Sequence, residues 1–137
     1  MYGWYQRGGR PNPATWVIDK LRKKEKINVV NDVYNNHLWA GQAANVIWKI
    51  IKSSIQQETY NMAGKNCISR YELALKVAKA FNLDSSLILP VKSSFFKNLA
   101  ARPKNTCFNT AKIEKELKIK PLSVDEGLRL MIKEEND

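Results

Sequence analysis

The feature that most limits the fold of this chain is its shortage of strand-like segments. Three stretches have the pattern of a β-strand: Ile27–Val30, Thr59–Ala63, which stops at Gly64, and Leu87–Val91. Pro90 keeps the third stretch out of the centre of a sheet. A sheet of two or three short strands is marginal by itself, and an open strand edge invites pairing with another chain. We therefore expect a helix-rich α/β fold that either dimerises or docks onto a larger sheet.

Helical signals cover most of the remaining sequence. Pro13 suits the first turn of a helix that runs to about Arg22. Ser69-Arg70-Tyr71-Glu72 and Ser123-Val124-Asp125-Glu126 are capping boxes, each with serine at the N-cap and glutamate three residues later. They predict a helix ending near Asn82 and a last helix with Leu128 and Met131 facing inward.

Two further helices are expected between these. Residues 38–54 show helical spacing, and a short helix capped by Thr110 carries Ile113 and Leu117. One broad apolar face of the longer helix comprises Trp39, Ala43, Val46, Ile47, Ile50 and Ile51. We expect loops at residues 34–36, and a loop or irregular helix from Phe95 to Asn105.

Composition favours one globular domain spanning residues 1–137. The chain is 44% hydrophobic and 26% charged. It contains no apolar run near the ~20 residues that cross a bilayer and no secretory signal, so we expect a cytoplasmic protein without a membrane partner. With one histidine and two cysteines, a metal site is not expected. Cys67 and Cys107 are expected to be buried thiols, with a disulfide between them left open.

The net charge of +10 raises the question of a nucleic-acid partner. A lysine-rich solvated surface explains the same charge, and we favour it. The densest basic run, Lys20 to Lys26, falls where the first helix should end, where cations complement the helix dipole. This run is not interleaved with aromatic residues, as a surface that binds single strands would be.

The sequence contains no convincing catalytic centre. Gly8-Gly9 follows no strand, so it is not a dinucleotide-binding turn. His37 is the only histidine and has no obvious catalytic partner, so we expect a structural role for it. Arg102 is a better candidate for binding, because an arginine held by a following proline suits bidentate contact with phosphate. Composition alone favours an ordinary surface loop around Arg102, Lys104 and Asn105.

The order of several motifs resembles a known family. The segments are PNPATWVIDKLRKKEKINVV, YNMAG, SRYE, LILPVKSS, RPKN, TAKIEKEL and VDEGLRLM. In this order and spacing they resemble the C-terminal half of the dTDP-4-dehydrorhamnose reductase family, which are extended short-chain dehydrogenases of the NAD-dependent epimerase type. The resemblance implies a substrate-binding domain with no complete Rossmann sheet, in which residues 1–13 are a former interdomain loop.

The resemblance also implies site residues. It assigns Arg102 to the pyrophosphate of a sugar nucleotide, and less strongly Asn105 and Asn12 to the same ligand. Full-length relatives bind NAD(P) and use a Tyr-x-x-x-Lys pair. Here no tyrosine is followed four residues later by lysine, and the glycine-rich turn is missing. We therefore expect no catalytic, cofactor-binding or metal-binding residue, and no cofactor, in this chain.

One segment departs from the family pattern. Where the family has Pro-Thr and then an acidic pair, this chain has His37-Leu38 and Gly41-Gln42. The threonine would cap the helix and the acids would suit its dipole. Both supports are lost here, and Gly41 further weakens the first turn. The change puts substrate binding in doubt and indicates that this surface has changed its use.

Three functions follow as hypotheses. The first is a truncated reductase-like protein that is not catalytic alone and either binds a dTDP-sugar weakly or pairs with another chain. Its partner would be a second copy, joined through an exposed strand or apolar surface, or a separate dinucleotide-binding chain. The second is a protein-interaction or regulatory module of reductase-like origin, and the third, ranked last, is a basic nucleic-acid binder. A natural short gene and a fragment of a longer enzyme both fit the sequence.

Overall fold

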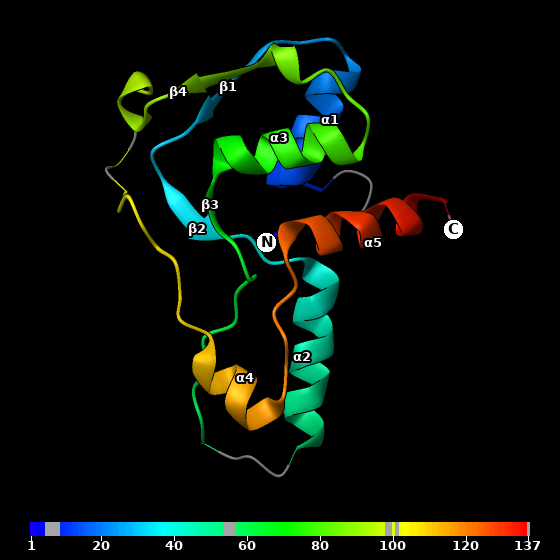
Figure 1. The fold of residues 1–137 in the computed structure, drawn as a ribbon, viewed down its shortest axis with the longest axis vertical. Helices are drawn as coiled ribbons and strands as arrows, with labels where there is room; N and C mark the ends of the chain where they lie inside the picture. Colours follow the sequence, from blue (N-terminus) through cyan, green and yellow to red (C-terminus); the bar gives the residue numbers. More distant parts are fainter. Residues whose placement is uncertain (5–8, 54–56, 98–99, 101, 137) are drawn as a thin grey trace.

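The computed structural model describes residues 1–4, 9–53, 57–97, 100 and 102–136. Parts of three expected segments lie outside the described residues: 5–8 of the interdomain loop, Ser54 of the second helix, and 98, 99 and 101 of the irregular segment. Within the described ranges the elements, in chain order, are α1 (Pro13–Arg22), β1 (Ile27–Val30), β2 (Tyr34–Asn36), α2 (Ala40–Lys52), β3 (Cys67–Ser69), α3 (Arg70–Ala80), the 3₁₀ turn η1 (Ser85–Leu87), β4 (Ile88–Val91), the 3₁₀ turn η2 (Ser93–Phe95), α4 (Ala111–Leu117) and α5 (Val124–Asn136) (Figure 1).

The main hydrophobic core forms where α3 packs against both α1 and α5. The helix α3 begins as the sequence predicts, because the Ser69 hydroxyl accepts the Glu72 N–H while the Glu72 carboxylate accepts the Ser69 N–H. Its inward face is completely buried, as are the facing residues of α5; these are Leu73, Ala74, Val77, Ala78, Val124, Leu128 and Met131. Burying one large apolar side chain contributes roughly 1.5–3 kcal/mol, so this core is the main source of stability.

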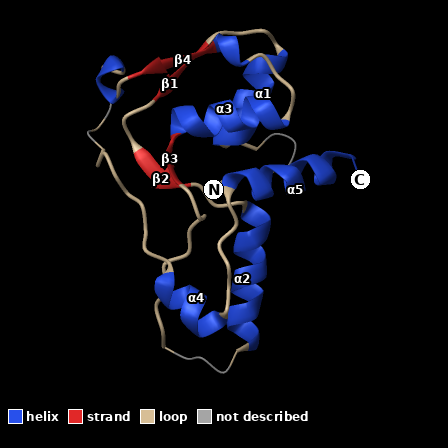
Figure 2. Ribbon diagram, viewed as in Figure 1, coloured by secondary structure: helices blue, strands red, loops and turns tan. Residues whose placement is uncertain are grey.

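The strands form two separate sheets of two strands each, and the described residues contain no closed sheet (Figure 2). β1 pairs in parallel with β4, with Val29 opposite Pro90, and β2 pairs antiparallel with β3, with Asn36 opposite Cys67. Pro90 therefore occupies an edge strand, as predicted. The expected helix-rich α/β class is confirmed. None of the described helices has the length and hydropathy needed to cross a membrane.

Two expectations about strands were wrong. Tyr34–Asn36 was expected to be a loop but forms β2, because it finds a partner in Cys67–Ser69, far along the chain. Thr59–Ala63 was expected to be a strand but has no regular secondary structure and no ladder partner among the described residues. Its alternation serves burial instead, since Tyr60 and Met62 pack into a small second core.

This second core joins α2 and α4, which lie together below the main core in Figure 1. Val46 of α2 packs there with Ile113 and Leu117 of α4, each at most 5% exposed. The short helix forms where predicted, but the Thr110 side chain does not cap it. The Asn109 side chain accepts the Ala111 N–H instead.

The expected broad apolar face of α2 is only partly covered. Ala43 and Val46 are buried, whereas Ile47, Trp48 and Ile51 are 53%, 60% and 65% exposed. α4 has only seven residues and covers one side of α2, which leaves these three residues in solvent. We call Ile47, Trp48 and Ile51 the α2 patch. The three residues form one exposed apolar cluster on the helix.

Tyr2 fastens the N-terminal segment to the core. It is 2% exposed, its N–H donates to the Leu38 carbonyl at 2.9 Å, and its hydroxyl donates to the Val124 carbonyl at 3.3 Å. Gly127 of α5 faces the same hydroxyl, and a Cβ at Gly127 would collide with it. The glycine is therefore required by packing rather than by helix propensity.

We predict that Gly127→Ala lowers the free energy of unfolding. Alanine normally stabilises a helix interior by about 1 kcal/mol relative to glycine. Overpacking a core costs about 1–3 kcal/mol, so the net effect here is destabilising. Urea unfolding measures the change. In a Tyr2→Phe background, which removes the hydroxyl, Gly127→Ala should lower the free energy of unfolding by less. If alanine stabilises the protein equally in both backgrounds, the packing argument is contradicted.

Candidate functional site

The candidate site is built on β2. Its antiparallel neighbour β3 lies along one edge, and on the other edge residues 104–106 run parallel to it. The Tyr34 N–H donates to the Lys104 carbonyl at 2.8 Å, and the Thr106 N–H donates to the Tyr34 carbonyl at 3.0 Å. β2 thus fixes the segment that directly follows Arg102.

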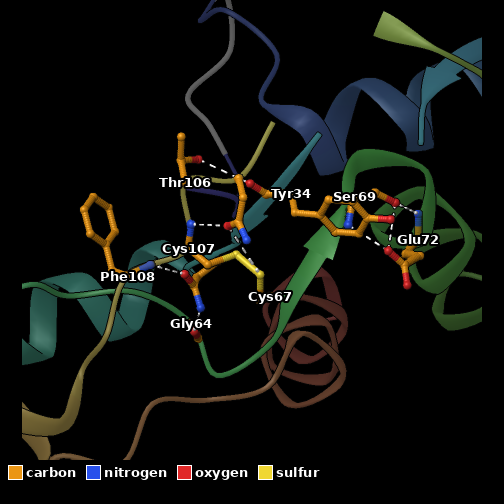
Figure 3. Close-up of a disulfide and its surroundings, with 10 residues drawn as sticks. Tyr34, Gly64, Cys67, Ser69, Glu72, Thr106, Cys107 and Phe108 are labelled. Atoms are coloured by element: carbon orange, nitrogen blue, oxygen red, sulfur yellow. Dashed lines mark hydrogen bonds between the residues drawn. A yellow bond between two sulfur atoms is a disulfide. The ribbon is translucent and has the colours of Figure 1, made fainter. Parts of the chain in front are cut away.

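A disulfide joins the two neighbours of β2. Cys67 of β3 is bonded to Cys107, with 5.7 Å between their Cα atoms and 40 residues between them in the sequence (Figure 3). The expectation of two buried thiols was wrong, since the cysteines pair and Cys67 is exposed. The reason is the β2–β3 pairing, which the sequence did not predict and which brings the two residues together.

Two asparagines organise the turn that follows. The Asn105 side-chain oxygen accepts the Cys107 N–H at 2.9 Å, and the Asn36 side-chain oxygen accepts the Phe108 N–H at 2.7 Å. The Asn36 amide also donates to the Gly64 carbonyl at 3.0 Å. No partner for the Asn105 amide nitrogen is found among the described residues, so that donor can contact a ligand. Sequence reasoning missed Asn36 because it placed the residue in a loop.

Arg102 lies two residues before Lys104, where the segment beside β2 begins. It is exposed, and its guanidinium makes no hydrogen bond or ion pair within the described part of the chain. An arginine with all its donors free suits bidentate binding of a phosphate. Arg102 thus closely precedes the segment 104–106 that β2 holds, which contains Asn105. Surface hollows of about 390 and 280 Å³ occur elsewhere, along α2 and beside α4, and neither is lined by either residue.

Asp32 contacts residues on both sides of Arg102 in the sequence, Ser93 and Lys104. Its carboxylate accepts the Ser93 N–H at 2.7 Å and the Ser93 hydroxyl at 3.1 Å, and it lies 3.8 Å from the Lys104 ammonium. The backbone hydrogen bond from Ser93, more than any other cause, lowers the pKa of Asp32. Asp32 is therefore ionised at neutral pH, and its carboxylate contacts both Ser93 and Lys104 just beyond the end of β1.

Asn12 has a structural task. Its side-chain oxygen accepts the N–H groups of Ala14 and Thr15 at the start of α1, and its amide donates to the Gly3 carbonyl at 2.5 Å. Both ends of the side chain are engaged within the chain, and no described contact links it to Arg102 or Asn105. Its contact with a sugar nucleotide stays a prediction.

The segment at the start of α2 that departs from the family pattern makes contacts other than the expected helix cap. As predicted, the N-cap Trp39 makes no side-chain capping bond and the first turn has no acidic residue. Gly41 lies under the Trp39 indole, where a Cβ would collide with the ring. Gln42 donates to the Lys120 carbonyl at 2.8 Å and accepts the Leu122 N–H at 3.0 Å. Sequence reasoning missed this clamp, which attaches α2 to the segment before α5.

The densest basic run is partly neutralised by local ion pairs. Lys20 pairs with Glu25, Lys23 with Asp19, and Arg22 with Glu135, at 2.5–3.0 Å. All three pairs are on the surface, where each contributes at most about 1 kcal/mol. They nevertheless reduce the positive potential that this run presents to an anionic polymer.

His37 is buried and 6% exposed, directly after β2. Its Nε2 has no hydrogen-bond partner among the described residues. Burial, followed by the positive charges of Arg70 and the N-terminus, lowers the pKa of His37 to about 4. The side chain is therefore neutral at pH 7. Its burial among packed elements agrees with the structural role that the sequence indicated.

We predict that His37 makes the protein less stable in mild acid. In the unfolded chain the imidazole has a pKa near 6.5, so between about pH 6.5 and 4 the unfolded state binds the extra proton. Stability is then lost as the pH falls through this window, by about 3 kcal/mol at most. Urea unfolding at several pH values measures it. The non-titrating variant His37→Leu should lose less stability across the window; an identical pH dependence would refute the assignment.

The described residues offer neither a metal centre nor a dinucleotide turn. No group of three His, Cys, Asp or Glu side chains suitable for a metal occurs among them. Of the described strands, β3 runs directly into a helix, and it does so through Ser69 and Arg70 without a glycine. A phosphate-binding turn needs glycine there so that the ligand can approach the backbone closely. The described junction of β3 and α3 therefore does not fit the diphosphate of NAD(P).

Three known proteins that this chain resembles are dTDP-4-dehydrorhamnose reductases. A curated dTDP-4-dehydrorhamnose reductase from Aggregatibacter actinomycetemcomitans is 25% identical over 123 residues, which cover 82% of this chain and 42% of the relative. The dTDP-4-dehydrorhamnose reductase structure from Bacillus anthracis, in complex with NADP, has a TM-score of 0.86 at 27% identity over 97% of this chain and 45% of that one. A reductase structure from Clostridium acetobutylicum has the same fold, with a TM-score of 0.82 at 19% identity over 95% and 45%.

This chain therefore spans less than half the length of these relatives. The matched part is a recognised unit, because the model of the "RmlD substrate binding domain" matches residues 2–136. The resemblance to the reductase family that the sequence motifs indicated is confirmed. The chain belongs to the RmlD substrate binding domain family.

Proposed function

We propose that this chain binds the diphosphate of a dTDP-sugar and does not catalyse its reduction alone. The observation that carries the proposal is the match of residues 2–136 to a substrate binding domain. The relatives are named for dTDP-4-dehydrorhamnose, which indicates the ligand class. The sequence has no Tyr-x-x-x-Lys pair, and within the described residues no strand leads through glycines into a helix, so hydride transfer would need groups that these residues do not supply.

In this proposal Arg102 contacts the diphosphate. Its guanidinium is exposed, free of described partners, and followed by Pro103, which restricts the backbone of Arg102 to extended conformations. The free amide of Asn105 adds a donor on the same loop. The chain's net charge of +10 attracts an anionic ligand over longer distances.

We predict that dTDP-glucose binds and that Arg102→Ala weakens the binding by roughly tenfold or more, as expected for loss of a charge-assisted bidentate contact. Isothermal titration calorimetry at low salt measures both. Arg129→Ala, which removes an exposed arginine of α5, is the matched control and should leave the affinity within about twofold, since only general electrostatic attraction is lost.

NAD(P)H should not bind in the same titrations. Two results would contradict the proposal: no binding of dTDP-glucose by the wild type at millimolar concentration, or equal losses of affinity in the Arg102 and Arg129 variants.

A second function, association with another chain, is favoured by the α2 patch. Its three large apolar residues are each more than half exposed, and Lys49 and Lys52 flank them. Burying such a patch is favourable by about 25 cal/mol per Å² of apolar surface. We propose self-association through this patch, and a separate dinucleotide-binding chain is the alternative occupant.

We predict a homodimer at tens of micromolar. Trp48→Glu with Ile51→Glu should convert it to a monomer, because burying either charge at an interface is costly. Light scattering after size exclusion measures the mass. Lys115→Glu, an exposed change on α4, serves as a control that should leave the dimer intact. A wild type that stays monomeric over the whole concentration range would refute self-association.

A further inference from the structure

The disulfide links the two segments that lie on either side of β2 in the candidate site. β2 lies between β3 and the segment 104–106; Cys67 belongs to β3, and Cys107 directly follows the segment 104–106. Cys67 lies opposite Asn36 in the β2–β3 register, and the residue after Cys107 donates its N–H to Asn36. The bond therefore crosses the end of β2 and joins its two sides directly (Figure 3).

The disulfide lies outside both hydrophobic cores. Neither cysteine belongs to the apolar clusters of α1, α3 and α5 or of α2 and α4. Cys67 is exposed and Cys107 is half-buried. A thiol reagent can therefore reach the bond while the cores stay packed. The consequence of breaking it should be local to the loop rather than global.

Without the bond, the loop near Arg102 would be held, among the described residues, only by its hydrogen bonds to β2 and by the surface ion pair of Lys104 with Asp32, 3.8 Å apart. The remaining described attachments of residues 104–108 to β2 are the Tyr34–Lys104, Thr106–Tyr34 and Phe108–Asn36 hydrogen bonds. These lie on an exposed edge, where each contributes roughly 1 kcal/mol. Such an edge opens readily, and a ligand that needs the closed loop would then have to order it on binding.

We propose that the Cys67–Cys107 disulfide is a reversible clip that sets the affinity of the Arg102 loop for its anionic ligand. Oxidised, it keeps residues 102–108 against β2, and reduced, it releases them. The readout by ligand rests on the proposed function, whereas the release of the loop does not.

The chemical step uses a dithiol as the reductant. Its thiolate attacks the exposed Cys67 sulfur, the bond between the two cysteines breaks, and Cys107 leaves as a thiolate and takes up a proton. The second thiol of the reductant then displaces Cys67. Two electrons and two protons reach the protein, which ends with two thiols, and the dithiol ends as a disulfide. Oxidised glutathione supplies the reverse reaction by accepting the same two electrons.

The test compares oxidised protein, protein reduced with dithiothreitol, and the Cys67→Ser, Cys107→Ser double variant. Amide hydrogen exchange at Thr106 and Phe108, whose N–H groups bond to β2, should accelerate about tenfold more than exchange at Val77 and Ala78 of α3. Affinity for dTDP-glucose should fall about tenfold on reduction and return on reoxidation. The double variant should match the reduced form with or without dithiothreitol, and far-UV circular dichroism should stay unchanged.

The outcomes separate the two proposals. Two alkylatable thiols in protein kept under oxidised glutathione would overturn the clip, as would equal exchange at Thr106 in oxidised and reduced protein. Equal and measurable affinity for dTDP-glucose in both states would also overturn it. If the loop is released on reduction but dTDP-glucose binds in neither state, the release of the loop is supported and the proposed function fails.

Discussion

The packing of α3 against α1 and α5 is the interaction on which the rest of this structure depends. The two sheets have two strands each and are too small to be stable alone. β3 leads directly into α3 through the Ser69 cap, so the helix core fixes β3. β3 fixes β2, and β2 in turn fixes the segment that follows Arg102. The position of the candidate site therefore depends on the helix core, through β3 and then β2.

The elements that sequence predicted well are those set by local signals. α1 and β1 have the expected bounds, and the capping boxes at Ser69 and Ser123 begin helices where expected. A cap acts over three residues, so it is readable without knowledge of the fold. Pro90 similarly restricts its own strand to an edge. The resemblance to a reductase family added the order of these elements, and the match over residues 2–136 agrees with it.

The features that sequence did not predict depend on distant partners. β2 is a strand only because Cys67–Ser69 lies beside it, and the disulfide follows from that pairing. The structure of Thr59–Ala63 also depends on a distant partner, because its alternating pattern suits either pairing with another strand or packing on α4. At α2, the pattern identified apolar residues correctly but not which of them α4 would cover. Periodicity indicates a face, whereas the size of the neighbouring element decides its burial.

In the candidate site, Arg102 and Asn105 were named from a proline-restricted loop and a family resemblance, and their contact with a ligand stays a prediction. Asp32 and Asn36, which fix that loop, were missed because their partners lie far along the chain.

An NMR titration of the ¹⁵N-labelled, oxidised protein with dTDP-glucose tests the central claim most directly. If this chain is a sugar-nucleotide-binding domain, amide shifts should concentrate at residues 102–108 and at β2. Shifts confined to α2, or none at millimolar ligand, would contradict it.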